Sequence, residues 1–417
     1  MDLGSDMELF QTLTVEEARE SLKQHLKWKQ DGEDVLLHEA YGRYLLKDVL
    51  AQEDLPSFDR STMDGFAVHA GDTFGASSSL PAYLEVAGET RMGEGAAGFL
   101  ETGKAWAIPT GGMLPSGADA VVMLEYTEDL NGNTIGITRP VAPGENVVRR
   151  GEDVSKGSLI LRSGHRLRPQ DIGLLAALGM ATLEVRTPVK VGIISTGDEV
   201  VDVKETPKAG QVRDVNSYTL YGLVIETGGR PVLYGVVPDE FTALQGLMMK
   251  ALDENDLVLI SGGSSVGARD VARAVIASLG KPGVLFHGIS IRPGKPTIGA
   301  VVEGKPVFGL PGHPVSAMVV FDLLVKPLIK YNCYPDEKGN NLEFPLRAYL
   351  TRNVRSAAGR EDYLRVKLSE KGGRLYAEPV LGKSGLIATM VKADGLAKIP
   401  ATREGIEAGE EVEIRVF

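Results

Sequence analysis

Strands and helices alternate along residues 189–328, and this alternation constrains the fold more than any other feature of the sequence. Short runs rich in Val, Ile and Leu predict buried strands, and longer amphipathic segments predict helices. The predicted strands are 189–195, 231–237, 257–261, 284–291, 297–302 and 306–310; the predicted helices are 217–226, 240–252, 268–279 and 315–329. We therefore expect a doubly wound, mostly parallel sheet, with ligands bound at the carboxyl ends of its strands.

The rest of the chain predicts smaller parts around this sheet. Thr14 and Glu17 have the spacing of a capping box, and the helix that they begin is expected to end near Asp31-Gly32. Between residues 52 and 151, short apolar runs alternate with turns such as Asn131-Gly132, which predicts a β-rich insert. The strands expected there are 65–68, 83–86, 105–108, 120–123 and 134–137; a helix is expected over 169–178.

The predicted fold class is a multidomain α/β chain with the wound domain, the β-rich insert and a small C-terminal β domain. The expected division is an N-terminal helix packing on the wound domain (1–31), a linking domain (32–51 and 152–186), the insert (52–151), the wound domain (187–334) and the C-terminal domain (340–417). A chain of 417 residues is long enough for several cores.

Charge and cysteine content exclude several classes of function. The net charge of −11 makes nucleic acid or an anionic membrane surface an unlikely partner, so an anionic substrate would need a local basic pocket. A single cysteine builds neither a disulfide framework nor a thiolate zinc site. The first residues do not resemble a signal peptide and no apolar stretch is long enough to cross a bilayer, so we expect a cytoplasmic protein.

Three carboxylates follow predicted strands of the wound sheet. Glu199, Asp239 and Asp270 lie on loops that should meet at one sheet edge. Carboxylates gathered in this way repel one another unless a cation joins them, which favours Mg²⁺ held together with substrate phosphates. The alternative is that each carboxylate caps a helix, and for Asp239 capping is the simpler explanation.

Three further loops at the same edge suit an anion. Ser261, Gly262, Gly263 and Ser265 lie between a strand and a helix, where backbone N–H groups can face an anion, although the loop is no Walker A motif and a tight turn is the alternative. Two cations, Arg292 and Lys295, flank a proline-stiffened turn. The third loop leads into the last helix; its residues of interest are Pro311, Pro314 and Ser316, with His313 interpreted as structural.

Two polar stretches outside the wound domain also predict a site. Residues 56–67 and 109–115, with 149–153 later in the chain, are densely polar yet lie between predicted strands. The residues alone indicate no substrate for them.

Taken in order, these motifs resemble the molybdopterin molybdenumtransferases of the MoeA type, which also occur as the E domain of gephyrin. The markers are 61–68, 109–111, 150–153, 195–199, 261–267, 293–296 and 310–317. Singly they are weak, but in this order they are highly specific, and the resemblance spans essentially all 417 residues.

The resemblance implies a reaction in molybdenum cofactor biosynthesis. Molybdenum from molybdate would enter adenylylated molybdopterin, with Mg²⁺ as cofactor and AMP released. The family works as a homodimer whose cleft joins the wound domain of one subunit to the insert of the other, and transient contact with other proteins of the pathway is expected.

Site residues carry over position by position. The resemblance implies catalytic roles for Asp64, Thr110, Asp153, Glu199 and Asp270, and metal binding by Glu199, Asp239 and Asp270. The implied substrate-binding residues are Asp239, Ser261, Gly262, Gly263, Ser265, Arg292, Lys295, Pro311, Pro314, Ser316, Arg360 and Ser384.

The sequence departs from the family at a few positions, and two rival functions remain open. His313 stands where many members have asparagine, and Arg292 replaces a lysine found in some. One rival is an adenylyltransferase, since the wound domain alone could serve that reaction. The other is a gephyrin-like scaffold, although the chain lacks the additional adenylyltransferase domain of that protein.

Overall fold

The computed structural model describes residues 12–27, 31–262, 266–333 and 346–417, without the side chains of 266–270 and 331–333. The chain forms two compact units, one of Met1–Glu33 with Arg186–Phe417 and one of Asp34–Val185.

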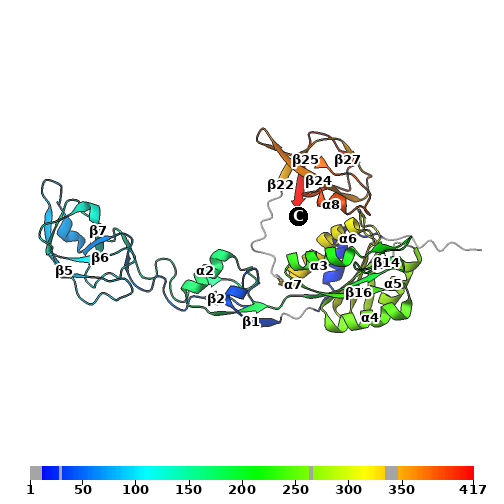
Figure 1. Ribbon diagram of the computed structural model, residues 1–417, viewed down its shortest axis with the longest axis horizontal. Helices are drawn as coiled ribbons and strands as arrows, with labels where there is room; N and C mark the ends of the chain where they lie inside the picture. Colours follow the sequence, from blue (N-terminus) through cyan, green and yellow to red (C-terminus); the bar gives the residue numbers. More distant parts are fainter. Residues whose placement is uncertain (1–11, 28–30, 263–265, 334–345) are drawn as a thin grey trace, which may run out of the picture. The chain divides into compact units, whose positions relative to one another are not determined.

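A six-stranded sheet forms the centre of the first unit (Figure 1). Its strands, in spatial order, are β16 (Arg230–Val237), β13 (Lys190–Thr196), β17 (Leu257–Gly262), β21 (Lys305–Leu310), β20 (Ile298–Val302) and β18 (Pro282–His287). The first four strands run parallel and the last two are antiparallel. The predicted doubly wound, mostly parallel sheet is confirmed.

Helices cover both faces of this sheet and explain its apolar runs. The helices are α3 (Asn216–Glu226), α4 (Phe241–Glu254), α5 (Val266–Ser278) and α6 (Pro314–Val320), which continues through a π-helical turn, η4 (Phe321–Val325), into α7 (Lys326–Cys333). Consecutive side chains of β13 enter opposite cores: Ile193 packs with α3, α6 and η4, and Ile194 packs with α4 and α5. A strand buried on both faces must be apolar at successive positions, as the sequence predicted.

Two predicted boundaries are wrong. The first helix, α1 (Val15–Lys23), has the predicted Thr14 capping box but ends well before Asp31. After it, the N–H groups of His25 and Leu26 donate to carbonyls only three residues back, at Leu22 and Lys23, and the Lys27 N–H donates to the carbonyl of Gly304. The strand expected over 284–291 ends at His287, because Gly288 (φ +113°) turns the chain and β19 (Ile291–Arg292) joins another sheet.

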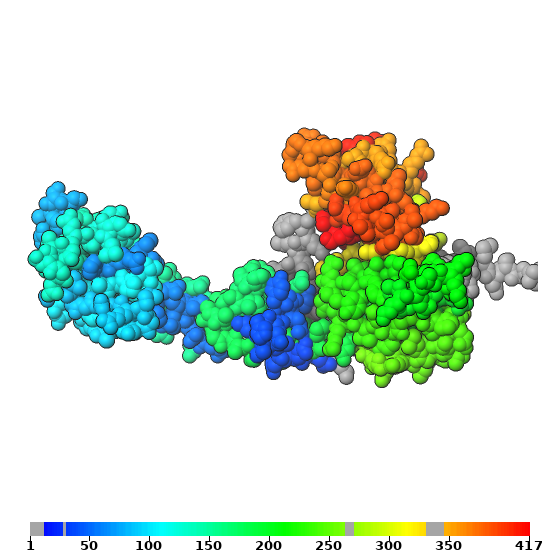
Figure 2. Space-filling view, viewed as in Figure 1, coloured from blue at the N-terminus to red at the C-terminus, as the bar shows by residue number. Residues whose placement is uncertain are grey.

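The C-terminal part of the first unit is a small β domain, as predicted. Its strands are β22 (Leu346–Leu350), β23 (Val354–Arg355), β24 (Glu361–Lys371), β25 (Arg374–Pro379), β26 (Gly395–Ile399), β27 (Gly405–Ile406) and β28 (Glu411–Val416), with a short helix α8 (Ala388–Val391). Pairing of β24 with both β25 and β26 closes the order β24-β25-β22-β28-β26 into a ring. Strand β19 extends this sheet, and both parts of the unit can be followed by colour in Figure 2, green to yellow and then orange to red.

The second unit contains the β-rich insert and the linking segments. The insert has a six-stranded sheet in the order β7 (Ala120–Met123), β4 (Gly65–Val68), β6 (Lys104–Ile108), β5 (Ala82–Glu89), β9 (Thr134–Ile137) and β8 (Thr127–Asp129). Shorter elements complete it: β3 (Arg60–Ser61) with β10 (Val147–Val148), and the 3₁₀ turns η2 (Ala70–Thr73) and η3 (Leu124–Tyr126). All five predicted insert strands are present, and the hairpin at Asn131-Gly132 joins β8 to β9.

The linking segments have their own core around α2 (Pro169–Ala177). The paired strands here are β1 (Gly32–Leu36) with β12 (Thr182–Arg186) and β2 (Val49–Leu50) with β11 (Leu159–Leu161); η1 (Leu37–Glu39) follows β1.

In the first unit, the short strands β14 (Val200–Val201) and β15 (Val212–Arg213) also pair. None of the helices in the described residues is both long and apolar enough to span a membrane.

The end of β17 leaves no room for a side chain. Gly262 pairs with Thr196 and has φ +143°, and a Cβ there would lie 1.7 Å from the Thr196 carbonyl oxygen. We expect Gly262→Ala to lower the free energy of unfolding by about 2 to 4 kcal/mol. Gly246→Ala is the control, because it lies in α4 with no atom within 4 Å of its Cβ position, and it should be neutral or stabilising by up to about 1 kcal/mol. Urea titration of both variants and the wild type measures the free energies of unfolding.

A buried carboxylate holds the start of α2. Asp171 Oδ2 accepts hydrogen bonds from the Arg168 backbone N–H at 2.8 Å and from Arg168 Nε at 3.0 Å, and His165 Nε2 lies 2.7 Å from the same oxygen. Burial alone would raise the pKa of Asp171, but these hydrogen bonds outweigh it and lower the pKa from 3.8 to about 2. The ionised carboxylate therefore stabilises the fold.

This lowered pKa gives an acid-sensitive contribution to stability. The contribution is complete above the unfolded pKa of 3.8 and disappears as pH falls toward the folded value of about 2. We expect Asp171→Asn to destabilise the linking segments by about 2 kcal/mol near neutral pH and to remove this acid response. Hydrogen exchange at α2, compared in wild type and variant from about pH 5 downward, measures it. An unchanged acid response in the variant would contradict the assignment.

Candidate functional site

A buried polar cluster lies at the carboxyl end of β13. The Ser195 hydroxyl donates to Asp214 Oδ1 at 2.9 Å, and its oxygen lies 2.9 Å from Ser217 Oγ and 3.4 Å from Ser261 Oγ. All four residues are less than a tenth exposed. Ser261 was predicted from its motif, but Asp214 and Ser217 were not. The available signal was an aspartate three residues before a serine at the start of α3, where Asp214 Oδ1 accepts the Ser217 N–H at 3.0 Å.

Asp239 belongs to the same sheet edge. Its Oδ1 accepts the Thr196 hydroxyl at 2.6 Å, and its backbone N–H donates to Asp198 Oδ1 at 3.2 Å. It does not cap α4, since Glu240 stands at the N-cap and makes no side-chain capping bond. The helix-capping alternative for Asp239 therefore does not hold, and its carboxylate faces the end of β13.

The Glu199 carboxylate lies close to Gly197, in the turn that follows β13. Its Oε2 is 3.0 Å from the position that a Cβ on Gly197 would occupy, so the carboxylate lies over the Thr196-Gly197 backbone. Asp270 is part of α5, but its side chain is outside the described residues, as are Gly263 and Ser265. Among the side chains that the structure describes, no three His, Cys, Asp or Glu residues are arranged to hold a metal ion by themselves.

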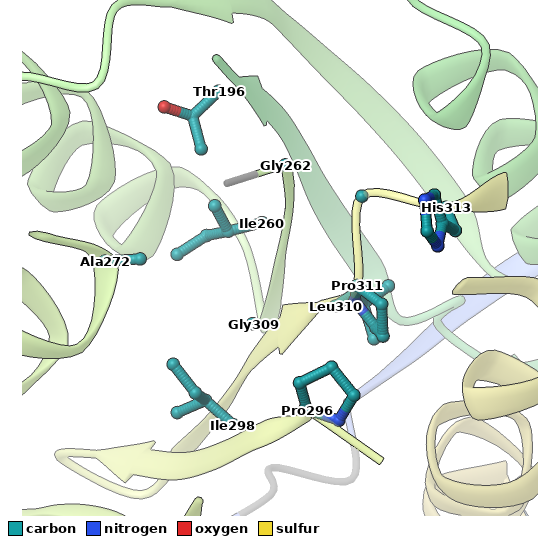
Figure 3. A pocket seen from close by; sticks show the side chains of 11 residues that line it. Thr196, Ile260, Gly262, Ala272, Pro296, Ile298, Gly309, Leu310, Pro311 and His313 are labelled. Carbon is teal, nitrogen blue, oxygen red and sulfur yellow. The ribbon is translucent and has the colours of Figure 1, made fainter. Parts of the chain in front are cut away.

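A cavity of about 170 Å³ opens beside this edge. Figure 3 shows Ala272, Ile260 and Ile298 toward one side of it and the rings of Pro296 and Pro311 toward the other. Its remaining wall comes from Thr196, Gly262, Gly309, Leu310, Gly312 and His313. A largely apolar cavity with a few polar groups at its rim suits a small organic ligand that carries some polar groups.

The loop from Leu310 to Ser316 belongs to the wound domain and makes hydrogen bonds to the C-terminal domain. His313 Nδ1 lies 2.9 Å from Ser384 Oγ, and the Val315 N–H donates to the Ser384 carbonyl at 3.2 Å. Pro314 is the first residue of α6, and Ser316 in its first turn is only 4% exposed. The structure thus brings Ser384 to the loop that contains Pro311, Pro314 and Ser316.

Three predicted cations lie on or near β19 and β24. Arg292 NH1 is 3.8 Å from Asp362 Oδ2, and Arg360 Nε donates to Asp362 Oδ1 at 3.0 Å. Asp362 is 7% exposed and was missed by the sequence analysis, because its role depends on the parallel pairing of β19 with β24. Lys295 follows on the same turn and is exposed.

In the second unit, the predicted residues Asp64 and Thr110 are in contact. The Thr110 N–H donates to Asp64 Oδ1 at 2.7 Å, and both residues are exposed. Backbone bonds between Ser61 and the 111–112 turn, at 2.8 and 3.0 Å, hold the two loops together. The fixed carboxylate keeps its second oxygen available to a ligand.

Asp153 lies on a third loop of this unit, which ion pairs hold in place. Asp59 accepts the Arg150 backbone N–H at 2.7 Å and Arg149 NH1 at 2.8 Å, and Asp54 accepts Arg150 Nε at 2.7 Å. Burial opposes ionisation of Asp59, but the two arginine contacts prevail and lower its pKa. Asp153 itself is exposed, and its N–H donates to the Leu55 carbonyl.

Comparison with known proteins agrees with this architecture along the chain. Residues 13–179 match the MoeA N-terminal region (domain I and II), residues 192–331 match a probable molybdopterin binding domain, and residues 347–417 match the MoeA C-terminal region (domain IV). A molybdopterin molybdenumtransferase from Haemophilus influenzae is 35% identical over 97% of this chain and 98% of its own length. The Bacillus subtilis protein of the same name is 35% identical over 94% of this chain and 91% of its own.

A solved structure is also similar over the whole chain. The molybdopterin biosynthesis MoeA protein from Pyrococcus horikoshii has a TM-score of 0.83 and 39% sequence identity, covering 97% of this chain and 99% of that one. Identity of this size over nearly complete chains shows common descent, and the sheet, the insert and the C-terminal β domain agree with it. The chain belongs to the molybdopterin molybdenumtransferase family of enzymes.

Proposed function

We propose that this enzyme inserts molybdenum from molybdate into adenylylated molybdopterin and releases AMP in a Mg²⁺-dependent reaction in the cytoplasm. The family relationship supports a place in molybdenum cofactor biosynthesis. The details of the reaction rest on the chemistry of the candidate site.

The strongest support is the pair of guanidinium groups that share one carboxylate. Each guanidinium has five N–H donors, so Asp362 cannot occupy all those of Arg292 and Arg360. The remaining donors, with Lys295 on the adjoining turn, suit a tetrahedral oxyanion such as molybdate or phosphate. In a chain of net charge −11, this cluster is a local basic site of the kind that an anionic substrate needs.

The carboxylates fit a magnesium ion only together with the substrate. Mg²⁺ is usually held by one or two carboxylates plus phosphate oxygens and water. Asp239, which accepts the Thr196 hydroxyl, and Glu199, close to Gly197, would provide two such groups, and Asp270 is the proposed third. When bound, the ion would neutralise negative charge on the phosphoanhydride.

The protein's own contribution is mainly position. The Thr196 hydroxyl fixes the carboxylate of Asp239, and the Thr110 N–H fixes that of Asp64. Positioning and cationic stabilisation of the departing AMP can supply most of the acceleration, so we propose that no covalent enzyme intermediate forms. We further propose that Asp64, Thr110 and Asp153 act in a cleft completed by a second copy of the chain.

AMP release tests the reaction directly. We expect the native protein to release AMP from adenylylated molybdopterin only when molybdate and Mg²⁺ are both present. Asp64→Ala should reduce the rate by about 100-fold or more, because it removes a carboxylate that the Thr110 N–H holds in place. Chromatographic quantification of AMP gives the rates.

Asp72→Ala is the matched control for that variant. Asp72 also accepts a backbone N–H, from Gly103 at 2.7 Å, but it lies in η2, outside the loops described above. Its variant should retain the native rate. No AMP release by the native protein under any condition would refute the proposed reaction and leave the family assignment intact.

The metal requirement tests the role of Asp239. We expect Asp239→Asn to raise the Mg²⁺ concentration needed for half-maximal AMP release by about 10-fold or more, since an amide is a weaker ligand than a carboxylate. Asp256→Asn is the control: Asp256 accepts the Lys190 N–H at 2.8 Å at the amino end of the same sheet. An equal Mg²⁺ dependence in both variants would exclude Asp239 as a ligand.

A further inference from the structure

Asn216 connects the cluster at the end of β13 with the wall of the cavity. Its Nδ2 donates to the Gly312 carbonyl at 3.0 Å, and the residue is only 7% exposed. Gly312 and its neighbours Pro311 and His313 all line the cavity. Asn216 is not among the site residues that the sequence motifs indicated.

The backbone at Asn216 is held rigidly on both sides. Asp214 accepts the Ser217 N–H at 3.0 Å and the Ser195 hydroxyl at 2.9 Å, and Ser217 Oγ lies 2.9 Å from Ser195 Oγ. These bonds attach residues 214–217 to the carboxyl end of β13. The end of β13 therefore fixes the position of the Asn216 amide, and this amide in turn holds the Gly312 carbonyl.

The amide orientation is determined by Gly312 and has a cost. A flipped amide would place Oδ1 against the Gly312 carbonyl oxygen, so Nδ2 must face it. In this orientation Oδ1 is buried, and no donor among the described residues is within hydrogen-bonding distance of it. A buried acceptor without a donor destabilises the fold, so stability alone does not explain this arrangement.

The other end of the loop is held by the C-terminal domain. Val315 N–H donates to the Ser384 carbonyl, and His313 Nδ1 contacts Ser384 Oγ. Asn216 is thus the attachment on the wound-domain side, next to the two cavity-lining rings of Pro311 and His313. Without it, Gly312 would be free to rotate its carbonyl, since glycine has few conformational restrictions.

We infer that Asn216 is a positioning residue of the ligand cavity, which fixes the Gly312 carbonyl and so holds Pro311 and His313 in the wall that the substrate meets. The identity of that substrate rests on the proposed function. Asn216 acts through the loop and does not touch the reacting atoms. Its loss should therefore raise the Kd for the ligand far more than it lowers the rate at which bound substrate reacts.

The test combines ligand binding with the mobility of the loop. Asn216→Ala removes the amide, and Asn216→Asp keeps its size but replaces the donor with a carboxylate that repels the Gly312 carbonyl. We expect both to raise the Kd for adenylylated molybdopterin, measured by calorimetry without molybdate, by about 5- to 30-fold, and to leave kcat for AMP release within about threefold. Hydrogen exchange of the Val315 and Ala317 amides, whose N–H groups donate to the Ser384 and His313 carbonyls, should increase in both variants.

Asn255→Ala is a closely matched control. Asn255 is 2% exposed, donates from Nδ2 to Tyr234 Oη at 2.6 Å and to the Ala251 carbonyl at 2.8 Å, and also has a buried Oδ1 without a described donor. It lies before β17, at the opposite end of the same sheet. Its variant should lower Tm at least as much as Asn216→Ala, with native Kd and native exchange at Val315 and Ala317.

The outcomes separate this inference from the proposed function. Faster exchange at Val315 and Ala317 in both Asn216 variants, with weaker binding, supports the inference. Unchanged exchange there, or equal weakening of binding in Asn255→Ala, overturns it. If the native protein does not bind adenylylated molybdopterin, the proposed function fails, and the exchange measurement still decides whether Asn216 positions the loop.

Discussion

The pairing of Thr196 with Gly262 is the contact on which the rest of the site depends. Two parallel strands end so close together that a Cβ on Gly262 would overlap the Thr196 carbonyl. This approach places Ser195 beside Ser261, and Thr196 at the rim of the cavity within reach of Asp239. Because interiors are tightly packed, a small displacement of one strand end would be transmitted to all these groups.

Much of the fold follows from local pattern. Side chains at Ile193 and Ile194 enter cores on opposite faces, so the strand had to be apolar at successive positions, and such a run is legible in the sequence. The loops could be placed for a related reason: parallel strands expose their carboxyl ends at one edge. That rule predicts that Glu199, Asp239 and Gly262 lie at one region of the sheet.

The other features of the fold and the site depend on contacts between segments far apart in the sequence, which local pattern does not encode. Beyond α1, the Lys27 N–H donates to the carbonyl of Gly304, a partner far along the chain. Asp362 acquires its role only when β24 pairs with β19. Asn216 resembles an ordinary residue at the start of a helix, and its partner Gly312 is 96 positions away. For Asp270 and the loop 263–265, the predictions lie outside the described residues.

Electrostatics sets a further condition on any anionic substrate. A net charge of −11 repels an anion at long range, but physiological salt screens that repulsion beyond roughly 8 Å. Recognition must then come from charges within a few ångströms, such as Arg292 and Arg360 on the carboxylate of Asp362. Such a site discriminates between ligands by shape and charge, because its donors act only after the ligand has entered. It does little to raise the rate of association. The rigid attachment of the loop at Gly312 matters for the same reason: short-range recognition tolerates little displacement of the groups that form the wall.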